Sequence, residues 1–384
     1  MRRILLLALG SFALGTDAFI VAGLIPDISR ETGVSEGLVG QMVSVFTLCY
    51  AISGPGLSSV LRMDTRRLLL TAIAVFTVGN IASALSDTLL TLLMSRAVSG
   101  IGAGLYSPTA AATAAALAPE GRRGRALSLL LAGLSVGTVI GVPLGLLMAA
   151  DHGWRSAFWL ISALGVIAAV GIAILIPRLQ LTTSPGIRAR LAVVIDRRVA
   201  PVVLVSLLFN IASLGLYTYI APVLRTAAGV TQPIPFLWAW GVGGIIGAFT
   251  VGALIDRASG ATRVMPFVAA LLMVATAAIV PAGTVLFAVA IAVGCWGAAG
   301  FASPPPQQHL ILERAADRGT VAVAANSSAI YLGGAIGSGL AGIALHLGLT
   351  AAALPVIASA FAAAALIVYL VFVARDRAPV VGND

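Results

Sequence analysis

The chain has 384 residues, of which 59% are hydrophobic and only 10% carry a charge. An ordinary soluble domain has about 25% charged residues, so this composition excludes that class and indicates a protein of the lipid bilayer. The formal net charge is +9, and all 23 basic residues are arginine. In a membrane protein the arginines mark the side on which each loop lies, so we expect no nucleic-acid partner.

Twelve apolar runs approach the length of about 20 residues that an α-helix needs to cross the hydrocarbon core. A β-barrel would instead show period-two alternation over segments of about ten residues, and runs such as 110–118 do not alternate. The sequence therefore predicts an all-α membrane protein with twelve transmembrane helices. The approximate spans are 4–25, 38–60, 68–86, 89–117, 126–150, 156–176, 200–224, 235–255, 263–282, 284–308, 320–345 and 350–373.

The arginines fall unevenly when the loops are assigned alternately to the two sides of the membrane. One side receives 19 of the 23. Basic residues accumulate on the cytoplasmic side, so we expect a multi-pass protein of the cell (inner or plasma) membrane with both termini in the cytoplasm. The first run follows Arg2 and Arg3 as in a signal peptide, but it continues to Ile25 without a cleavage motif, so we interpret it as a spanning helix. The absence of lysine suggests a GC-rich, bacterial genome.

The longest polar stretch, residues 177–198, separates six spans from six. We expect a six-helix bundle over 1–177, a cytoplasmic linker over 178–199 and a second six-helix bundle over 200–384. The halves repeat each other in order, because GLYSP and GTVIG of the first half match GFASP and GGAIG of the second. Parallel repeats of this kind are typical of secondary transporters, whose substrate site lies between the halves.

Small residues recur every four positions in the fifth and eleventh spans. Such faces let helices approach closely in the bilayer, where no hydrophobic effect drives their association. Packing inside a bundle is the simpler interpretation. The alternative is a sliding seam between the halves, in which Pro143 locally breaks helical hydrogen bonding. The residues are Gly133, Gly137, Gly141 and Gly145 in the fifth span and Gly333 and Gly337 in the eleventh.

The segment 96–159 runs from RAVSGIGAGLYSP through RRGRALSLLLAGLSVGTVIGVPLG to GWRSAFW. It resembles the major facilitator superfamily, specifically its twelve-span drug:proton antiporters and the related exporters of chloramphenicol, sugars and nucleosides. The arginine and glycines of the fourth span and the GTVIGVPLG of the fifth are similar to signatures of these exporters. The resemblance implies two pseudo-symmetric bundles, alternating access and a monomer. It further implies multidrug or antibiotic resistance through proton-coupled efflux of a small amphipathic or aromatic compound.

The loops depart in part from the pattern of that family. Its second loop resembles G-x-L-A-D-R-x-G-R-R, whereas this chain reads GLSSVLRMDTRR with Val60 at the position of the aspartate. In the exporters that this chain resembles, the first-helix acid often falls at the position of Ala18, one residue after the aspartate of this chain. We expect the loop charges to pair across the halves or with helix ends as a gate, or simply to anchor the cytoplasmic side. They are Asp64, Arg66, Arg67, Asp256 and Arg257.

Asp17 and Arg96 are the two charged residues that lie clearly deep in the predicted spans. An isolated charge at this depth costs about 2.5 to 3.5 kcal/mol, so such residues have a partner or a wet cavity. Asp17 precedes the outer end of its helix by roughly 13 Å, and Arg96 follows the outer end of the fourth span by a similar distance. The sequence therefore predicts that Arg96 balances Asp17. The pair either locks two helices or couples transport to proton binding at Asp17.

The remaining polar residues of the spans indicate a ligand cavity. Aromatic and amide groups in apolar surroundings suit a mixed aromatic or amphipathic small molecule, although each residue can also serve helix packing. The candidates are Ser107, Asn210, Ser213, Tyr217, Trp296, Ser303, Gln307, Asn326 and Tyr331.

Other classes of membrane protein fit less well. An intramembrane enzyme needs a catalytic constellation such as H-E-x-x-H, an ATP-driven pump needs a phosphate-binding loop, and a channel needs a ring of like charges. The chain offers none of these motifs. We therefore expect no enzymatic activity, no cofactor and no metal, and we expect a small-molecule substrate and protons as partners within the bilayer. A sugar or nucleoside exporter and a proton-coupled importer or passive facilitator stay open.

Overall fold

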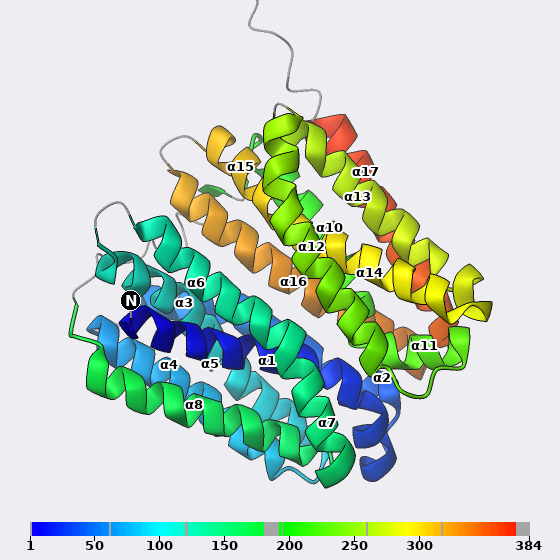
Figure 1. Cartoon of the computed structure of the whole chain (residues 1–384), viewed down its shortest axis with the longest axis horizontal. Helices are drawn as coiled ribbons and strands as arrows, with labels where there is room; N and C mark the ends of the chain where they lie inside the picture. Colours follow the sequence, from blue (N-terminus) through cyan, green and yellow to red (C-terminus); the bar gives the residue numbers. More distant parts are fainter. Residues whose placement is uncertain are drawn as a thin grey trace, which may run out of the picture.

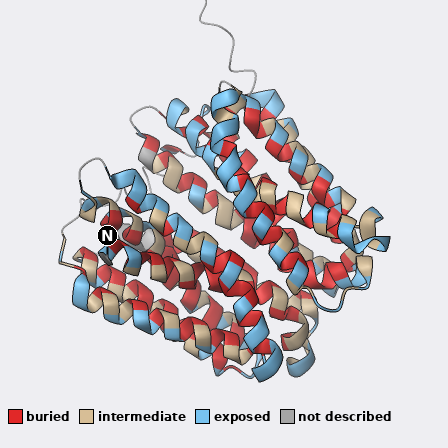
Figure 2. Ribbon diagram, viewed as in Figure 1, coloured by how far each residue is buried: buried red, intermediate tan, exposed pale blue. Residues whose placement is uncertain are grey.

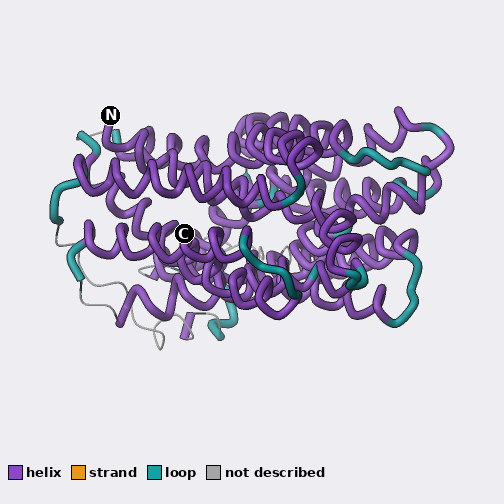
Figure 3. The backbone as a smooth tube through the Cα atoms, turned by 90° about the horizontal axis from the view of Figure 1, so that it is seen from below, coloured by secondary structure: helices purple, strands orange, loops and turns teal. Residues whose placement is uncertain are grey.

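The computed structural model describes residues 2–60, 63–119, 122–179, 192–193, 195–258, 260–315 and 318–373. Figure 3 shows helices joined by short loops, and no strand occurs within these ranges. Twelve helices in the described ranges are long and apolar enough to cross a membrane. They coincide with the twelve predicted spans, so the predicted fold class is confirmed.

The first half of the chain forms one bundle of helices, drawn in blue to green in Figure 1. The Asp64 carboxylate caps one of these helices by accepting from the backbone N–H of Arg67, and Thr88 and Thr91 form a reciprocal capping box at the start of the next. The elements are α1 (Arg2–Thr32), α2 (Glu36–Val39), α3 (Gln41–Val60), α4 (Thr65–Ala84), α5 (Leu89–Leu117), α6 (Arg123–Val136), the π-helix η1 (Gly137–Gly141), α7 (Val142–His152) and α8 (Arg155–Leu175).

The second half forms the other bundle, drawn in green to red. Its tenth span is divided at Ser303, because three consecutive prolines, 304–306, offer no N–H to the carbonyls of the preceding turn. The elements are α10 (Ala200–Thr218), α11 (Ile220–Ala228), α12 (Ile234–Arg257), α13 (Ala261–Ala278), η2 (Pro281–Thr284), α14 (Leu286–Ala302), α15 (Pro304–Arg314), α16 (Gly319–His346), η4 (Ala351–Ala353), α17 (Leu354–Val368) and η5 (Tyr369–Val373). The predicted linker over 178–199 falls mostly outside the described residues.

Buried residues concentrate inside each bundle, and the outward faces of the helices are exposed (Figure 2). Many exposed residues are large and apolar, for example Phe249 at 83% and Ile174 at 73% exposed. Lipid can cover such residues at no cost, whereas water could not, so the surface agrees with a membrane location.

The glycine faces lie inside the bundles. Gly133, Gly137 and Gly141 face Ala8, Phe12 and Thr16 of α1, one turn after another. In the second bundle Gly333 and Gly337 of α16 face Leu207 and Ile211 of α10 in the same way. Gly145 continues the first series against Ile20. In this conformation these faces pack on a helix of the same bundle, as the packing interpretation predicts, and not on the other half of the chain.

The fifth span contains a π turn at Gly137–Gly141, directly before Val142 and Pro143. Pro143 has no N–H for the usual i→i−4 bond, and the N–H of Val142 instead reaches the carbonyl of Gly137, five residues back. The Thr16 hydroxyl donates to the same Gly137 carbonyl at 3.1 Å. The break in helical bonding predicted near Pro143 is thus present, and it joins the fifth span to α1 beside Asp17.

The two bundles meet along α3 and α16 and between α1 and the α10–α11 segment. At the end where α2 and α11 lie, several hydrogen bonds cross the interface (Figure 1). At the opposite end, where the N-terminus lies, no hydrogen bond or ion pair joins the bundles among the residues described. We call the first of these ends the joined end.

Candidate functional site

Asp17 and Arg96 form a fully buried ion pair. Nη1 of Arg96 lies 2.6 Å from Oδ1 of Asp17, and Nη2 lies 3.4 Å from the Asp17 backbone oxygen. Both residues are 0% exposed. The predicted pairing is confirmed, and its role in proton coupling stays a prediction.

Apolar rings enclose the guanidinium. The Cζ atom of Arg96 lies 4.3 Å from the ring centre of Phe46 on α3 and 5.8 Å from that of Phe158 on α8. The faces of these rings attract the positively charged guanidinium through cation–π interactions. The ion pair is therefore held by helices of one bundle and does not face the interface between the bundles.

Asn80 of α4 is the third polar residue of this site, and the sequence analysis did not identify it. Its Nδ2 donates to Oδ2 of Asp17 at 3.5 Å and to the backbone oxygen of Phe76 at 3.0 Å. Oδ1 of Asn80 and Nε of Arg96 are buried without a hydrogen-bond partner among the described residues. Burying an amide in a membrane span costs far less free energy than burying a charge. An asparagine is therefore a weak signal in the sequence, although its position within an apolar run is visible.

Phe19, two residues after Asp17 on α1, points to the other bundle. Its ring makes an edge contact with Tyr217 of α10 at a centroid distance of 5.3 Å and a tilted contact with Trp240 of α12 at 5.6 Å. Trp240 in turn lies 6.3 Å from Trp296 of α14, whose indole N–H donates to the Ser213 hydroxyl at 3.0 Å. We call Phe19, Tyr217, Trp240, Trp296 and Phe301 the aromatic cluster.

The aromatic cluster brings together the predicted residues Ser213, Tyr217 and Trp296. The sequence analysis missed Phe19 and Trp240, which the spacing could have suggested. Trp240 shares one helix face with Gly243, Gly244 and Gly247, the face that packs on α14. Nε1 of Trp240 is buried and lacks a hydrogen-bond partner within the described ranges.

Tyr50 and Tyr331 stack on each other across the interface, with centroids 3.8 Å apart. Ser107 of α5 lies within hydrogen-bonding reach of the Tyr50 hydroxyl. Beside this stack a central cavity of about 20 Å³ is lined by Ala18, Phe19, Tyr217, Tyr331 and neighbours. That volume is about the size of one water molecule, so the interface is tightly packed at mid-membrane in this conformation.

The predicted amide residues lie deep in the second bundle. Gln307 and Asn326 are 0% and 1% exposed, and neither amide atom of Gln307 nor Oδ1 of Asn326 has a partner in the described part of the chain. Nδ2 of Asn210 donates to the backbone oxygen of Ser206, one turn back. Ser303 donates to the Gly300 carbonyl at the division between α14 and α15.

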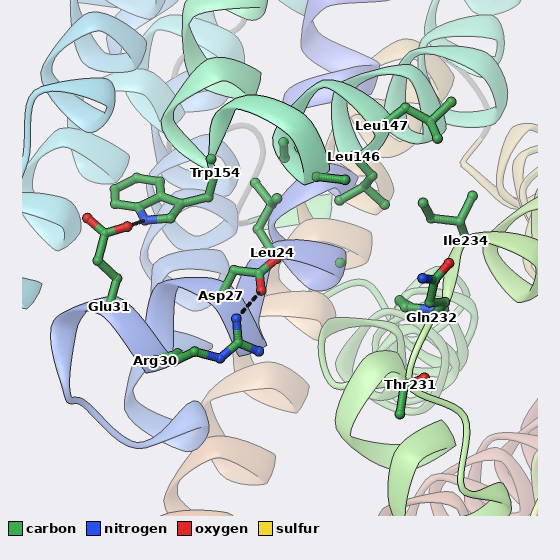
Figure 4. Close-up of a pocket in the computed structure, with 15 residues that line it drawn as sticks. Leu24, Asp27, Arg30, Glu31, Leu146, Leu147, Trp154, Thr231, Gln232 and Ile234 are labelled. Carbon is green, nitrogen blue, oxygen red and sulfur yellow. Dashed lines mark hydrogen bonds and ion pairs between the residues drawn. The ribbon is translucent and has the colours of Figure 1, made fainter.

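A larger cavity of about 560 Å³ opens near the joined end, between α1 and α7 on one side and the α11–α12 loop on the other. In Figure 4 Trp154 donates to Glu31 and Arg30 pairs with Asp27, opposite Thr231, Gln232 and Ile234. The Arg155 guanidinium also pairs with Glu31 and Asp87. These charges are therefore already neutralised within the first bundle, and none of them had been predicted as part of the site.

The predicted loop charges do not pair between the bundles among the residues described. Asp64 pairs with Arg67 at 3.3 Å and caps α4, and Arg66 donates to the backbone oxygen of Ala173. Asp256 and Arg257 are exposed at the end of α12. The expectation of cross-half pairing is not met in this conformation, whereas pairing with a helix end is present for Asp64.

An ion pair and several hydrogen bonds instead join the bundles at the joined end. Arg225 pairs with Glu36 at 2.7 Å, and the Tyr219 hydroxyl lies 3.2 Å from the Gly37 carbonyl oxygen. Ser44 and Ser338 share a hydrogen bond of 2.8 Å. Ser35 and His346, and Gln41 and the Gly339 carbonyl, add further bonds of 3.2 Å each.

Twelve spanning helices in two bundles, with a buried ion pair on one side and a polar aromatic cluster on the other, define a membrane transport protein. The chain belongs to the Major Facilitator Superfamily, whose family model matches residues 7–338. It is therefore a multi-pass inner membrane protein and a secondary transporter, as the sequence resemblance implied.

Relatives along nearly the whole chain support this assignment. The inner membrane transport protein YdhP of Escherichia coli (strain K12) is 31% identical over 379 residues, which are 98% of this chain and 96% of that protein. A chloramphenicol resistance protein of Streptomyces lividans is 32% identical over 343 residues, 86% of each chain.

Solved structures share the fold at lower sequence identity. A D-xylose-proton symporter aligns with a TM-score of 0.79 at 18% identity, over 96% of this chain and 97% of that chain. A bacterial homologue of the human lysosomal transporter Spinster, in an inward-facing and unoccupied conformation, aligns with a TM-score of 0.74 at 16% identity, over 98% and 96%.

Proposed function

We propose that this transporter exports a neutral, aromatic, hydrogen-bonding small molecule, such as an antibiotic, in exchange for protons. The observation that carries the proposal is the position of α1. It places Asp17 in the buried ion pair of one bundle and Phe19 in the aromatic cluster of the other. Proton binding and substrate contact would then act on the same helix.

The substrate class follows from the second bundle. Its described spans carry charged residues only near their ends, for example Arg257 and Glu313. Its buried groups without partners among the described residues are neutral: the Trp240 indole N–H, the Gln307 amide and Oδ1 of Asn326. A neutral compound with an aromatic ring, a donor and an acceptor would satisfy these groups, whereas a charged compound would lack a counter-ion there.

Proton binding to Asp17 would neutralise the carboxylate and weaken its bond to Arg96, and proton release would restore it. A proton that crosses a potential of about 180 mV supplies roughly 4 kcal/mol, which is enough for a substrate gradient of about a thousandfold. The arginine distribution supports cytoplasmic termini. With that orientation the joined end would face outward, and this conformation would be the one closed to the outside.

Export rather than import rests on the fifth-span segment GTVIGVPLG and on the relative named as a chloramphenicol resistance protein. We further propose that the functional unit is a monomer, since each bundle buries its own polar groups and the site lies within one chain.

The test is chloramphenicol uptake into inverted membrane vesicles that carry the wild type, Asp17→Asn or the control Thr250→Ala, whose hydroxyl is exposed on α12 and bonds to the Ile246 carbonyl of its own helix. We expect uptake driven by an imposed pH gradient in the wild type and in Thr250→Ala, and none in Asp17→Asn with equal amounts of folded protein. Gradient-driven uptake in Asp17→Asn would reject proton coupling at this residue. Release of chloramphenicol from the vesicles down the same gradient would identify an importer.

A further inference from the structure

Asn80 is held against the ion pair from the side opposite the second bundle. It lies on α4, which packs on α5 and α8. It is 0% exposed. Its only side-chain neighbour in a hydrogen bond is Asp17, at 3.5 Å from Nδ2 to Oδ2, within the described residues. A residue in this position cannot touch a substrate between the bundles, so its polar group serves the ion pair.

When Asp17 is ionised, the NH₂ group of the Asn80 amide has hydrogen-bond partners but its oxygen has none. Nδ2 donates to Asp17 and to the Phe76 carbonyl. Oδ1 is a buried acceptor with no donor among the residues that the structure describes. Leaving such an acceptor unpaired costs about 1–3 kcal/mol, and an apolar side chain of the same size would avoid that cost. The amide therefore fits a second state of the site better than this one.

That second state is the protonated carboxyl. An ionised aspartate only accepts hydrogen bonds, whereas a protonated one carries an O–H that needs an acceptor. Arg96 offers only donors and cannot be that acceptor. Within the described residues, Asn80 is the other side chain that hydrogen-bonds the Asp17 carboxylate, and its Oδ1 is a buried acceptor beside that carboxylate with no donor.

We propose that Asn80 is the hydrogen-bond acceptor for the protonated form of Asp17. The proton adds to the carboxylate without any change in covalent bonds elsewhere. The amide turns about its Cβ–Cγ bond, where the torsional profile is broad, and presents Oδ1 to the new O–H. Asn80 is thus a positioning residue that stabilises the neutral acid. This inference rests on the proposed protonation of Asp17 and adds the residue that receives its hydrogen bond.

The test is infrared difference spectroscopy between acidic and alkaline pH on purified protein in lipid, with no substrate added. We expect the wild type to show the C=O stretch of a protonated carboxyl that Asp17→Asn abolishes. In Asn80→Leu this band should move to higher wavenumber, because the acid has lost its acceptor. In the matched control Thr77→Val it should stay in place, since the Thr77 hydroxyl bonds to the Ile73 carbonyl of its own helix.

A second measurement needs no substitution. In wild-type protein with ¹³C-carbonyl asparagine, an asparagine amide band should shift at the same pH as the Asp17 band, and this shift should vanish in Asp17→Asn. An Asp17 band that is identical in Asn80→Leu and the wild type, without a coupled asparagine shift, would overturn the role of Asn80 alone. Absence of any Asp17-dependent band would overturn both this inference and the proposed proton coupling.

Discussion

The Tyr219 hydroxyl oxygen lies 3.2 Å from the carbonyl oxygen of Gly37, across the interface between the two bundles. The same hydroxyl lies 3.0 Å from the carbonyl oxygen of Ser338, so its single proton is shared between the bundles. Gly40 and Gly342 leave the space that the phenol end of Tyr219 fills, and Gly37 lies against the Gly342 carbonyl. The joined end therefore closes around one aromatic side chain.

Replacing Tyr219 by phenylalanine should weaken closure of the joined end. One hydrogen bond contributes about 1 kcal/mol, which corresponds to a roughly fivefold change in the ratio of closed to open molecules. Spin-label distances across that end should show a larger open population. The control is Tyr106→Phe, because the Tyr106 hydroxyl donates to Leu7 within one bundle at 2.9 Å. Equal distance distributions in both variants would contradict the role of Tyr219.

Replacing Gly133 by alanine should destabilise the first bundle. An added Cβ would collide with the backbone carbonyl of Ala8, which cannot move aside as a flexible side chain can. Overpacking of this kind costs about 1–3 kcal/mol in the free energy of unfolding. Thermal unfolding in detergent measures the loss. Gly252→Ala on α12 is the control, since nothing lies within 4 Å of its added Cβ among the described residues. An unchanged melting temperature in Gly133→Ala would show that α1 and α6 can separate freely.

Removal of one partner of the buried ion pair should cost more than removal of both. Arg96→Leu leaves Asp17 without a counter-charge and should reduce the free energy of unfolding by about 3–5 kcal/mol. Asp17→Asn combined with Arg96→Leu should recover most of this loss. Denaturation in mixed micelles, followed by tryptophan fluorescence, measures each variant.

Arg155→Leu provides the comparison at a partly exposed site. Its pairs with Glu31 and Asp87 lie near the surface, where the loss should stay below about 1 kcal/mol. At the buried pair, losses of unfolding free energy that simply add for Asp17→Asn and Arg96→Leu would show that the two residues do not stabilise each other.

Acid should loosen the segment that precedes α10. The backbone N–H of Arg198, and then the Arg318 guanidinium at 2.5 Å, hold the pKa of Asp196 below its ordinary value. A lowered pKa in the folded state stabilises the fold above the ordinary aspartate pKa of about 3.9, and this contribution is lost as the pH falls through the lowered value. The protection factors of the amides around 196–200, which are corrected for the intrinsic pH dependence of exchange, should therefore fall below about pH 4 in the wild type. Asp196→Asn should show the lower protection at all pH values, and a wild type without such a transition would contradict the assignment.

The sequence predicted the twelve spans and the ion pair for one physical reason. Both depend on the free energy of transfer between water and hydrocarbon. Moving a charge into hydrocarbon costs much free energy, and so does leaving an apolar run in water. Asp17 and Arg96 stand out in apolar runs, and their equal depth follows from helix geometry.

Other parts of the site carry no such signal. Asn80 is neutral, so nothing in the sequence marks it as a neighbour of Asp17. The direction of a glycine face depends on which helix packs against it, so the sequence alone leaves both packing and a seam between the halves open. The contact of Tyr219 with Gly37 joins segments 182 residues apart. It depends on the conformation of the transporter and not on local pattern.

α1 presents Asp17 to its own bundle and Phe19 to the other. Side chains two positions apart on a helix point about 200° away from each other. A small axial rotation of α1 would therefore alter the ion pair and the aromatic contact in the same movement. Such a torsion needs neither a hinge nor a relay through a third element, so a single turning helix is sufficient to connect the interior of one bundle with the surface of the next.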